Sequence, residues 1–272
     1  MPMYRLAELN TEITGIGTCT EELLRPYLLP AEKIPLVPDI SVAMTAALRE
    51  KERRLEGSGF SADYLESMAV YRSFCEQALK REVMFFHASA VEYQGAAYLF
   101  SGPSGAGKST HAAMWKKAFG GAAVVINDDK PLLRFFDGAG ASDFSGMLTE
   151  YGESGTLTCS GGTNPVRSPA DSTAVYAYGT PWDGKRHLGC NLKIRVGGIA
   201  FLEKGKTVSI RRLGWREALE KARMQCFRSE TWENRQRYEM LLRRLLNTVP
   251  AYLLRCDIST RAAVTAYEAM KR

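Results

Sequence analysis

One short stretch of this 272-residue chain has the composition of a phosphate-binding loop. It fits the pattern G-x-x-x-x-G-K-[ST], in which glycines allow a tight turn and successive backbone N–H groups point at phosphate oxygens. The lysine of such a loop reaches the β- and γ-phosphates, and the hydroxyl after it can ligate Mg²⁺. The pattern predicts a nucleotide-binding P-loop formed by Gly102, Pro103, Ser104, Gly105, Ala106, Gly107, Lys108 and Ser109.

The residues on either side of this pattern predict the elements that a P-loop requires. Residues 96–100 are apolar and strand-like, and the helical composition of residues 109–119 ends at Gly120 and Gly121, which suit a helix C-cap. A helix that starts at the loop places the partial positive charge of its N-terminus at the phosphates. Thr110, in the first turn of that helix, is therefore included in the predicted nucleotide site.

Asp128 and Asp129 come after an apolar run, residues 122–126, that follows the expected P-loop helix. Phosphoryl-transfer enzymes place carboxylates at such a strand end, for Mg²⁺ and for the nucleophile. Two adjacent carboxylates cannot share one face of a regular strand, but at its end they can turn to different partners. The alternative is a polar turn that closes the strand; the P-loop upstream favours the functional interpretation.

Together with His87, the P-loop and the aspartate pair resemble the catalytic domain of HPr kinase/phosphorylase, whose fold is shared with phosphoenolpyruvate carboxykinase. In that family a histidine near a strand end precedes the P-loop, and an apolar strand ending in Asp-Asp follows the P-loop helix. Residues 86–133 carry the likeness, which extends more loosely over residues 60–270. The resemblance implies an α/β fold with a mixed sheet, built as an HPr kinase-like, phosphoenolpyruvate carboxykinase-like P-loop domain.

The resemblance also implies a reaction, the Mg²⁺-assisted transfer of the γ-phosphoryl group of ATP to a Ser or Thr hydroxyl of a peptide or protein. One of Asp128 and Asp129 would be the general base and the other would help to hold Mg²⁺. The sequence leaves the order open; we favour Asp128 as the base and Asp129, with Ser109, as the metal ligand. His87 would tune a carboxylate or touch phosphate, the alternative being a core histidine beside aromatic residues. Lys108 completes the predicted catalytic set.

Residues 177–185 resemble a segment of uncharacterised HPr-kinase-like proteins, whose relatives include lasso-peptide kinases. Lys185 and Arg186 follow a Pro-Trp-Asp-Gly turn, so we expect them on a loop that brings positive charge to the nucleotide phosphates. A solvated loop is the alternative, and Trp182 either stacks on a ligand or anchors the loop. Thr110 stands where HPr kinase has Glu, so phosphorylase activity and HPr as the substrate are not carried over.

Two parts are expected along the chain. Residues 1–58 are predicted to form a small N-terminal α+β module, and residues 59–272 the P-loop catalytic domain. The boundary is placed where the charged residues 51–56 give way to Gly57-Ser58-Gly59. Residues 138–172, rich in Gly, Ser and Thr, are expected to form loops with short strands.

The composition narrows the class of partner. The formal net charge is +6, but without a helix-turn-helix or RNA-recognition pattern, helix surfaces or an acidic substrate explain the basic residues better than nucleic acid. The sequence has no apolar run of membrane-spanning length and no signal-peptide core, and its six cysteines form no C-x-x-C pair. We expect a cytoplasmic protein whose partner is a peptide or protein with an acceptor hydroxyl, with no membrane partner; a homo-oligomer is left open.

Other functions remain open at this stage. A P-loop also suits a non-catalytic nucleotide-binding sensor or switch protein, and a kinase of a small hydroxylated molecule is the nearest variant of the main hypothesis. A carboxykinase is disfavoured because it needs further metal ligands and the chain has three histidines. The guanine-specific pattern Asn-Lys-x-Asp is absent from the sequence, which favours ATP over GTP.

Overall fold

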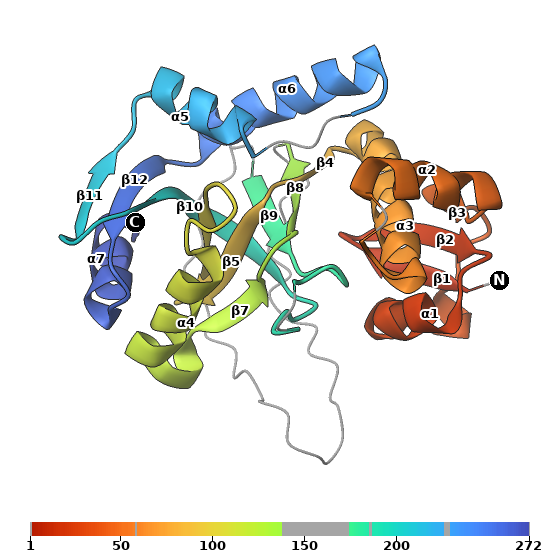
Figure 1. Ribbon diagram of the computed structural model, residues 1–272, viewed down its shortest axis with the longest axis horizontal. Coiled ribbons are helices and arrows are strands. Elements are labelled where there is room, and N and C mark those ends of the chain that lie inside the picture. Colours follow the sequence, from red (N-terminus) through yellow and green to blue (C-terminus); the bar gives the residue numbers. More distant parts are fainter. Residues whose placement is uncertain (1, 58, 138–173, 185–186, 226–228, 272) are drawn as a thin grey trace.

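Two β-sheets organise the described chain, a small one near the N-terminus and a larger one that holds the P-loop (Figure 1). Both sheets combine parallel and antiparallel pairs, and helices pack on them, so the predicted α/β class with a mixed sheet is confirmed. A computed structural model describes residues 2–57, 59–137, 174–184, 187–225 and 229–271.

The small sheet has the strand order β1-β2-β3, with β1 at Met3–Leu6, β2 at Leu9–Thr14 and β3 at Ile40–Ala43. Alternate side chains of β2 and β3 are buried, the period expected when one face of a sheet is covered. β1 and β2 pair antiparallel across a turn in which Ala7 and Glu8 both have positive φ, and β3 joins β2 in parallel.

Three α-helices accompany the small sheet in the described N-terminal part: α1 (Thr18–Leu24), α2 (Ala46–Glu56) and α3 (Ala62–Ala78). The hydroxyls of Thr45 and Ser61 cap α2 and α3, each accepting a hydrogen bond from the backbone N–H three residues on. These caps fix where each helix begins.

The larger sheet of the described chain follows the path β4-β8-β9-β10-β6-β5-β7, with β12 beside β10 and β11 beside β12. β10 pairs antiparallel with β9 through its first residues and in parallel with β6 and β12 further along. The strands are β4 (Val83–Phe85), β5 (Ala88–Tyr93), β6 (Ala96–Ser101), β7 (Val124–Asn127), β8 (Leu132–Phe136), β9 (Ala174–Tyr178), β10 (Lys193–Lys204), β11 (Ser209–Arg212) and β12 (Ala251–Cys256).

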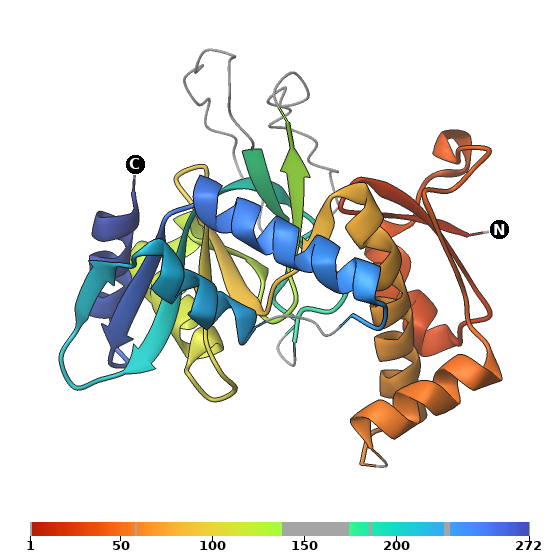
Figure 2. The same ribbon diagram turned by 90° about the horizontal axis from the view of Figure 1, so that it is seen from above.

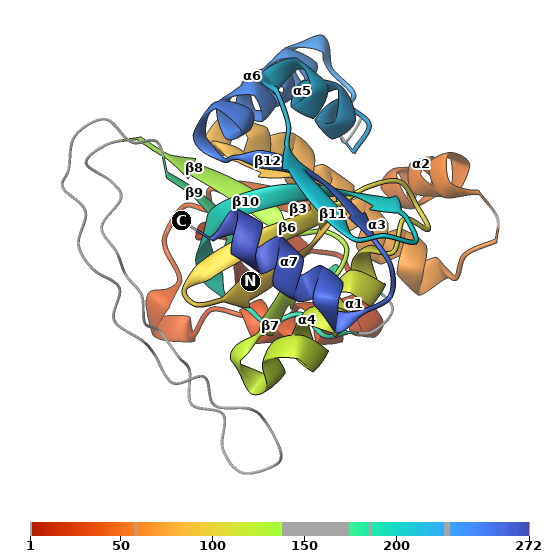
Figure 3. The ribbon, with the colours of Figure 1, turned by 90° about the vertical axis from the view of Figure 1, so that its left-hand side faces the viewer.

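Helices cover both faces of the larger sheet (Figure 3). α4 (Lys108–Phe119) and α7 (Thr260–Met270) lie on one face, where α4 buries Trp115 completely. α5 (Trp215–Arg223) and α6 (Trp232–Thr248) lie on the other face. The burial of α4 against the sheet fixes the position of the P-loop at its start. Within the described ranges, no helix has both the length and the apolar character needed to cross a membrane.

One hydrophobic cluster joins the two sheets through α3. Tyr71 and Phe74 of α3 belong to this cluster together with residues of the small sheet, Leu132 of β8 and Tyr178 of β9. The small sheet and its helices therefore pack directly on the part of the chain that carries the P-loop. The domain boundary at residue 58 stays a prediction.

Replacing Phe74 with Ala should lower the free energy of unfolding by about 3–5 kcal/mol, because it leaves a cavity where the two sheets meet. Urea denaturation followed by circular dichroism is the measurement. Leu36→Ala, at a fully exposed side chain, is the control and should change the free energy of unfolding by less than about 0.5 kcal/mol. An effect of Phe74→Ala no larger than that of the control would contradict this account of the core.

Candidate functional site

The predicted P-loop connects β6 to α4 and turns at glycines with positive φ. Gly105 and Gly107 have φ values of 77° and 99°, a region that residues with side chains rarely adopt. A Cβ added at Gly102 would approach the Cβ of Ala106 at 3.0 Å, so the loop is closely packed as well as turned. Because α4 begins at Lys108, the free N–H groups of its first turn lie at the loop.

Lys108 is nearly buried, and its ammonium group folds back onto the loop. Nζ donates to the backbone oxygens of Gly102 at 2.9 Å and Pro103 at 3.3 Å. Burial lowers the pKa of Lys108, and the negative charges of Asp129 and Asp128 oppose that shift. The lysine and both aspartates are therefore close enough to interact electrostatically.

The pairing of three adjacent strands brings the predicted residues to one edge of the sheet. β5 is antiparallel to both β6 and β7, so the start of β5 meets the ends of the other two strands. Ala88 pairs with Ser101, the last residue of β6, and Ala90 pairs with Asn127, the last residue of β7. His87, the P-loop and the aspartates are thereby placed together, although they are separated in sequence.

Asp128 is buried and is held by the neighbouring strand β5. The hydroxyl of Ser89, which is fully buried, donates to Asp128 Oδ1 at 2.7 Å. Shielding from water strengthens such a hydrogen bond, so it fixes the orientation of this carboxylate. The sequence analysis gave Ser89 no role; a hydroxyl in an otherwise mainly apolar strand was the available clue.

Asp129 has a different set of partners. Its Oδ1 lies 3.2 Å from His87 Nε2, and its Oδ2 contacts the ammonium group of Lys130. Burial would raise the pKa of Asp129, but the hydrogen bond from His87 and the charge of Lys130 outweigh it and hold the pKa at about 2. Asp129 is therefore ionised throughout the neutral pH range. The adjacent carboxylates have thus turned to different partners: Asp128 accepts a hydrogen bond from Ser89, and Asp129 contacts His87 and Lys130.

The side chain of Asn127 fixes the turn that carries both aspartates. Its Oδ1 accepts hydrogen bonds from the backbone N–H groups of Asp129 at 2.9 Å and Lys130 at 2.6 Å. Its Nδ2 donates to Thr180 Oγ1 at 2.8 Å, and the Thr180 hydroxyl in turn donates to the backbone oxygen of Lys130 at 2.9 Å. Asn127 is completely buried, so these bonds give both its Oδ1 and its Nδ2 a partner that water cannot supply. The sequence analysis assigned no role to either Asn127 or Thr180.

The loop that follows β9 lies against the aspartate turn. A Cβ added at Gly184, where φ is 80°, would lie 3.3 Å from the Cβ of Asp129. Asp183 Oδ2 accepts a hydrogen bond from the backbone N–H of Gly189 at 2.7 Å, which closes the loop on itself. Lys185 and Arg186, predicted to serve the nucleotide, lie outside the described residues.

Trp182 anchors this loop to α3 rather than standing free to stack on a ligand. Its indole Nε1 donates to the backbone oxygen of Ser67 at 3.0 Å. Its ring lies 4.9 Å from that of Tyr71 and 6.4 Å from that of Phe74, measured between centroids, and it is 6% exposed. Of the two roles that the sequence left open, the structure supports anchoring.

The other two histidines have partners of their own. His111, in α4, is buried, accepts a hydrogen bond from Trp115 Nε1 at 3.0 Å, and has its pKa lowered by burial to about 4. His187 Nδ1 lies 3.0 Å from Asp183 Oδ1 at the exposed end of the loop. Neither is among the groups that surround the aspartate pair.

The donors available to a metal ion at this site are oxygens. Ser109 and Thr110 are half-buried in the first turn of α4, and two carboxylates lie at the neighbouring strand end. A hydroxyl and a carboxylate suit Mg²⁺, which prefers hard oxygen ligands and keeps several waters or phosphate oxygens. In the part of the chain that the structure describes, no group of three or more His, Cys, Asp or Glu residues could hold a metal ion alone.

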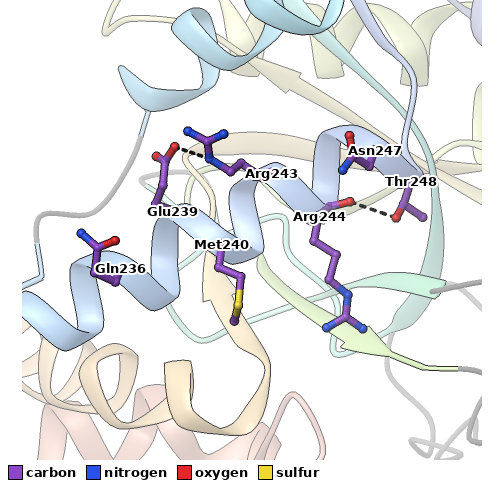
Figure 4. A pocket seen from close by; sticks show the side chains of 7 residues that line it. All are labelled: Gln236, Glu239, Met240, Arg243, Arg244, Asn247 and Thr248. Atoms are coloured by element: carbon purple, nitrogen blue, oxygen red, sulfur yellow. Dashed lines mark hydrogen bonds and ion pairs between the residues drawn. The ribbon is translucent and has the colours of Figure 1, made fainter.

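A separate groove of about 540 Å³ runs along α6, away from the P-loop (Figure 4). Its charged side chains are paired: Arg243 bonds to Glu239 at 2.8 Å, and Arg244 bonds to Glu82 at 2.6 Å. It contains none of the residues discussed above, so its size does not make it the functional site. The groove is lined by Gln236, Glu239, Met240, Arg243, Arg244, Asn247 and Thr248.

Comparison with protein-family models gives no match for this chain, and comparison with curated proteins gives none either. The geometry of the loop and the aspartate turn therefore carries the functional argument.

The low pKa of Asp129 gives a test of the site's electrostatics. In metal-free protein, the carboxyl of Asp129 should titrate well below the ordinary value of 3.8 in a ¹³C NMR titration, and His87→Ala should move its pKa upward by removing the hydrogen bond. Because the folded-state pKa is depressed, the stabilisation from Asp129 is complete above about pH 4 and is lost as the pH falls toward about 2.

The matched control for this titration is His187→Ala, because His187 contacts Asp183 instead. It should leave the titration of Asp129 unchanged. An Asp129 that titrates near its ordinary value in the unmodified protein would show that His87 and Lys130 do not hold it as described.

Proposed function

We propose that this protein is an ATP-dependent kinase that transfers the γ-phosphoryl group to a hydroxyl, that of a Ser or Thr in a peptide or protein. The observation that carries the proposal is the convergence of Lys108 with Asp128 and Asp129 at one edge of the sheet. A phosphate-binding loop alone suits any nucleotide-binding protein. Two differently held carboxylates beside it supply what phosphoryl transfer needs in addition.

The P-loop and Lys108 would hold the triphosphate. Successive N–H groups at the loop and at the start of α4 are donors for phosphate oxygens, and the Lys108 ammonium adds a full positive charge. The bonds to Gly102 and Pro103 already hold the Lys108 side chain at the loop. Nucleotide binding therefore costs little further side-chain entropy. The likeness to HPr kinase noted in the sequence supports the same assignment.

The environments of the two aspartates support different roles. Asp129, with a pKa held at about 2, is a weak base and keeps its negative charge, which suits a ligand of Mg²⁺ together with Ser109. Asp128, oriented by Ser89, is the better candidate for the group that accepts the hydroxyl proton. When bound, Mg²⁺ would neutralise charge on the phosphate oxygens.

The proposed transfer forms one bond to the γ-phosphorus, breaks another and moves one proton. The acceptor hydroxyl oxygen forms a bond to the γ-phosphorus while the bond from that phosphorus to the β,γ-bridging oxygen breaks, so ADP leaves. The proton of the hydroxyl passes to the Asp128 carboxylate. Asp128 and the P-loop contribute position and charge, which account for most of the catalysis in reactions of this class.

Replacing Lys108 with Ala should reduce nucleotide turnover by at least about a hundredfold, the loss expected for a transition-state charge contact of roughly 3 kcal/mol. The measurement is release or transfer of the γ-phosphate of labelled ATP. Lys116→Ala, at an exposed position of the same helix, is the matched control and should keep normal turnover. Near-normal turnover without the Lys108 ammonium would overturn the P-loop assignment.

The aspartate pair separates a kinase from a nucleotide sensor. Asp128→Asn should retain ATP·Mg²⁺ binding in calorimetry but lose single-turnover transfer, because an amide cannot accept the hydroxyl proton. Asp129→Asn should also weaken the metal-dependent affinity for ATP. Asp137→Asn, at the far end of β8, is the control and should change neither.

If both site variants keep transfer within about threefold of the unmodified protein, neither aspartate is catalytic and the kinase proposal loses its main support. If the two phenotypes are exchanged, the mechanism stands with the roles of the aspartates reversed. Binding of ATP with no transfer in any form of the protein would favour the sensor.

A further inference from the structure

An aromatic stripe on α3 continues past the point where the loop after β9 covers it. Tyr71 and Phe74 contact Trp182 of that loop. Tyr64, on the same side of the helix two turns earlier, and Phe60, just ahead of the helix, remain 38% and 47% exposed. Their rings stack with centroids 4.7 Å apart. We call these two residues the Phe60–Tyr64 pair.

The Phe60–Tyr64 pair lies beside the aspartate turn. Trp182 is anchored at Ser67, whose hydroxyl donates to the backbone oxygen of Tyr64 at 2.9 Å, so the loop attaches one helical turn from the pair. Two residues after Trp182, Gly184 packs against Asp129. Figure 2 shows the β6–α4 loop and the start of α3 at the same edge of the molecule.

The electrostatics agree with this placement. Burial and the charge of Glu56 raise the pKa of Tyr64, and the charge of Asp129 raises it further. Tyr64 is therefore within electrostatic range of Asp129. Phe60 and Tyr64 stack on each other, and both remain partly exposed in the described part of the chain.

The helices beneath the pair are held rigidly. The guanidinium group of Arg72, on α3, donates to both carboxylate oxygens of Glu52 at 2.9 Å and to Glu56 at 3.0 Å, which ties α2 to α3. Glu52 is 2% exposed, so this bidentate pair is shielded from water. A surface that is preformed loses less conformational freedom when it binds a partner.

We propose that the Phe60–Tyr64 pair docks an apolar or aromatic side chain of the peptide whose hydroxyl is phosphorylated. This inference rests on the proposed kinase function and names a feature of its substrate. α3 rises about 10 Å between Tyr64 and Tyr71, so the pair lies two helical turns from the aromatic contact with Trp182. Because the pair and the aspartate turn both have fixed places, the docked side chain stands at one position relative to the acceptor hydroxyl. Two stacked rings offer a third ring both face and edge contacts.

The test uses synthetic peptides that contain one Ser acceptor in an Ala, Gly and Lys background. A single Phe is placed at each position up to five residues on either side of the Ser, and kcat/KM for transfer of labelled phosphate is measured with the full chain. The unmodified protein should prefer Phe at one position, on one side of the Ser, by about tenfold over the peptide without Phe, a preference equal to about 1.4 kcal/mol.

The double variant Phe60→Ala/Tyr64→Ala should lose this preference through a higher KM, whereas Phe60→Leu/Tyr64→Phe should keep most of it. Leu36→Ala/Val37→Ala is the matched control, because both side chains are strongly exposed on the same N-terminal part of the chain, and it should keep the full preference. Urea denaturation checks that the Ala double variant remains folded.

Two results would overturn the docking surface alone: no positional preference in the unmodified protein, or a preference that survives in the Ala double variant. Lys108-dependent hydrolysis of ATP with no transfer to any peptide would also overturn it, while leaving the nucleotide site in place. The absence of both Lys108-dependent hydrolysis and transfer would overturn the proposed function with it.

Discussion

The buried amide of Asn127 is the contact on which the arrangement of the site depends. It accepts hydrogen bonds from the N–H groups of Asp129 and Lys130 and donates one to Thr180, so it joins the end of β7 to the loop that follows β9. Leaving a buried polar group without a partner costs about 1–3 kcal/mol, which is a strong reason for the turn to keep this shape. The shape sends one carboxylate toward Ser89 and the next toward His87.

The sheet topology places this turn at the same edge as the P-loop. Because β5 runs antiparallel to both β6 and β7, the P-loop, the aspartate turn and His87 reach the same edge without any long-range loop having to bring them there. β10 is parallel to β6, and its Leu202 backbone lies 3.4 Å from a Cβ placed on Gly102. Two features therefore favour Gly102 at this position: its backbone has positive φ, and the backbone of β10 would contact a Cβ placed there.

Much of the fold could be predicted because its determinants are local. The P-loop glycines, the strand before them and the helix at 109–119 follow from patterns of composition within a few residues. The turn between β1 and β2 could not be predicted locally, because Ala7 and Glu8 adopt positive φ without the glycine that normally marks such a turn. The helix α2 was not predicted; the charged residues 51–56, which precede the expected boundary, form its second half.

The candidate site was predictable in its P-loop and in its ionisable side chains. Lys108, Asp128, Asp129 and His87 could be proposed from residue type and order, and the structure brings them to one edge. The residues that orient these side chains could not be proposed from residue type and order. Ser89 becomes a partner of Asp128 only because β5 pairs with β7, and this depends on tertiary pairing that a single sequence does not encode locally.

The charges of Lys108, Lys130 and the two aspartates act on one another across the site. Asp129 accepts a hydrogen bond from His87 and pairs with Lys130, whereas Lys108 lies in the field of both aspartates. A nucleoside triphosphate would bring several negative charges to a place that already holds two carboxylates, and the two sets of negative charge would repel each other. A bridging cation resolves this conflict, because it turns the aspartates from repelling groups into ligands. The same two carboxylates that would oppose a bare triphosphate would favour one that arrives with Mg²⁺, so the proposed kinase would depend on the metal because of the charge arrangement of its site.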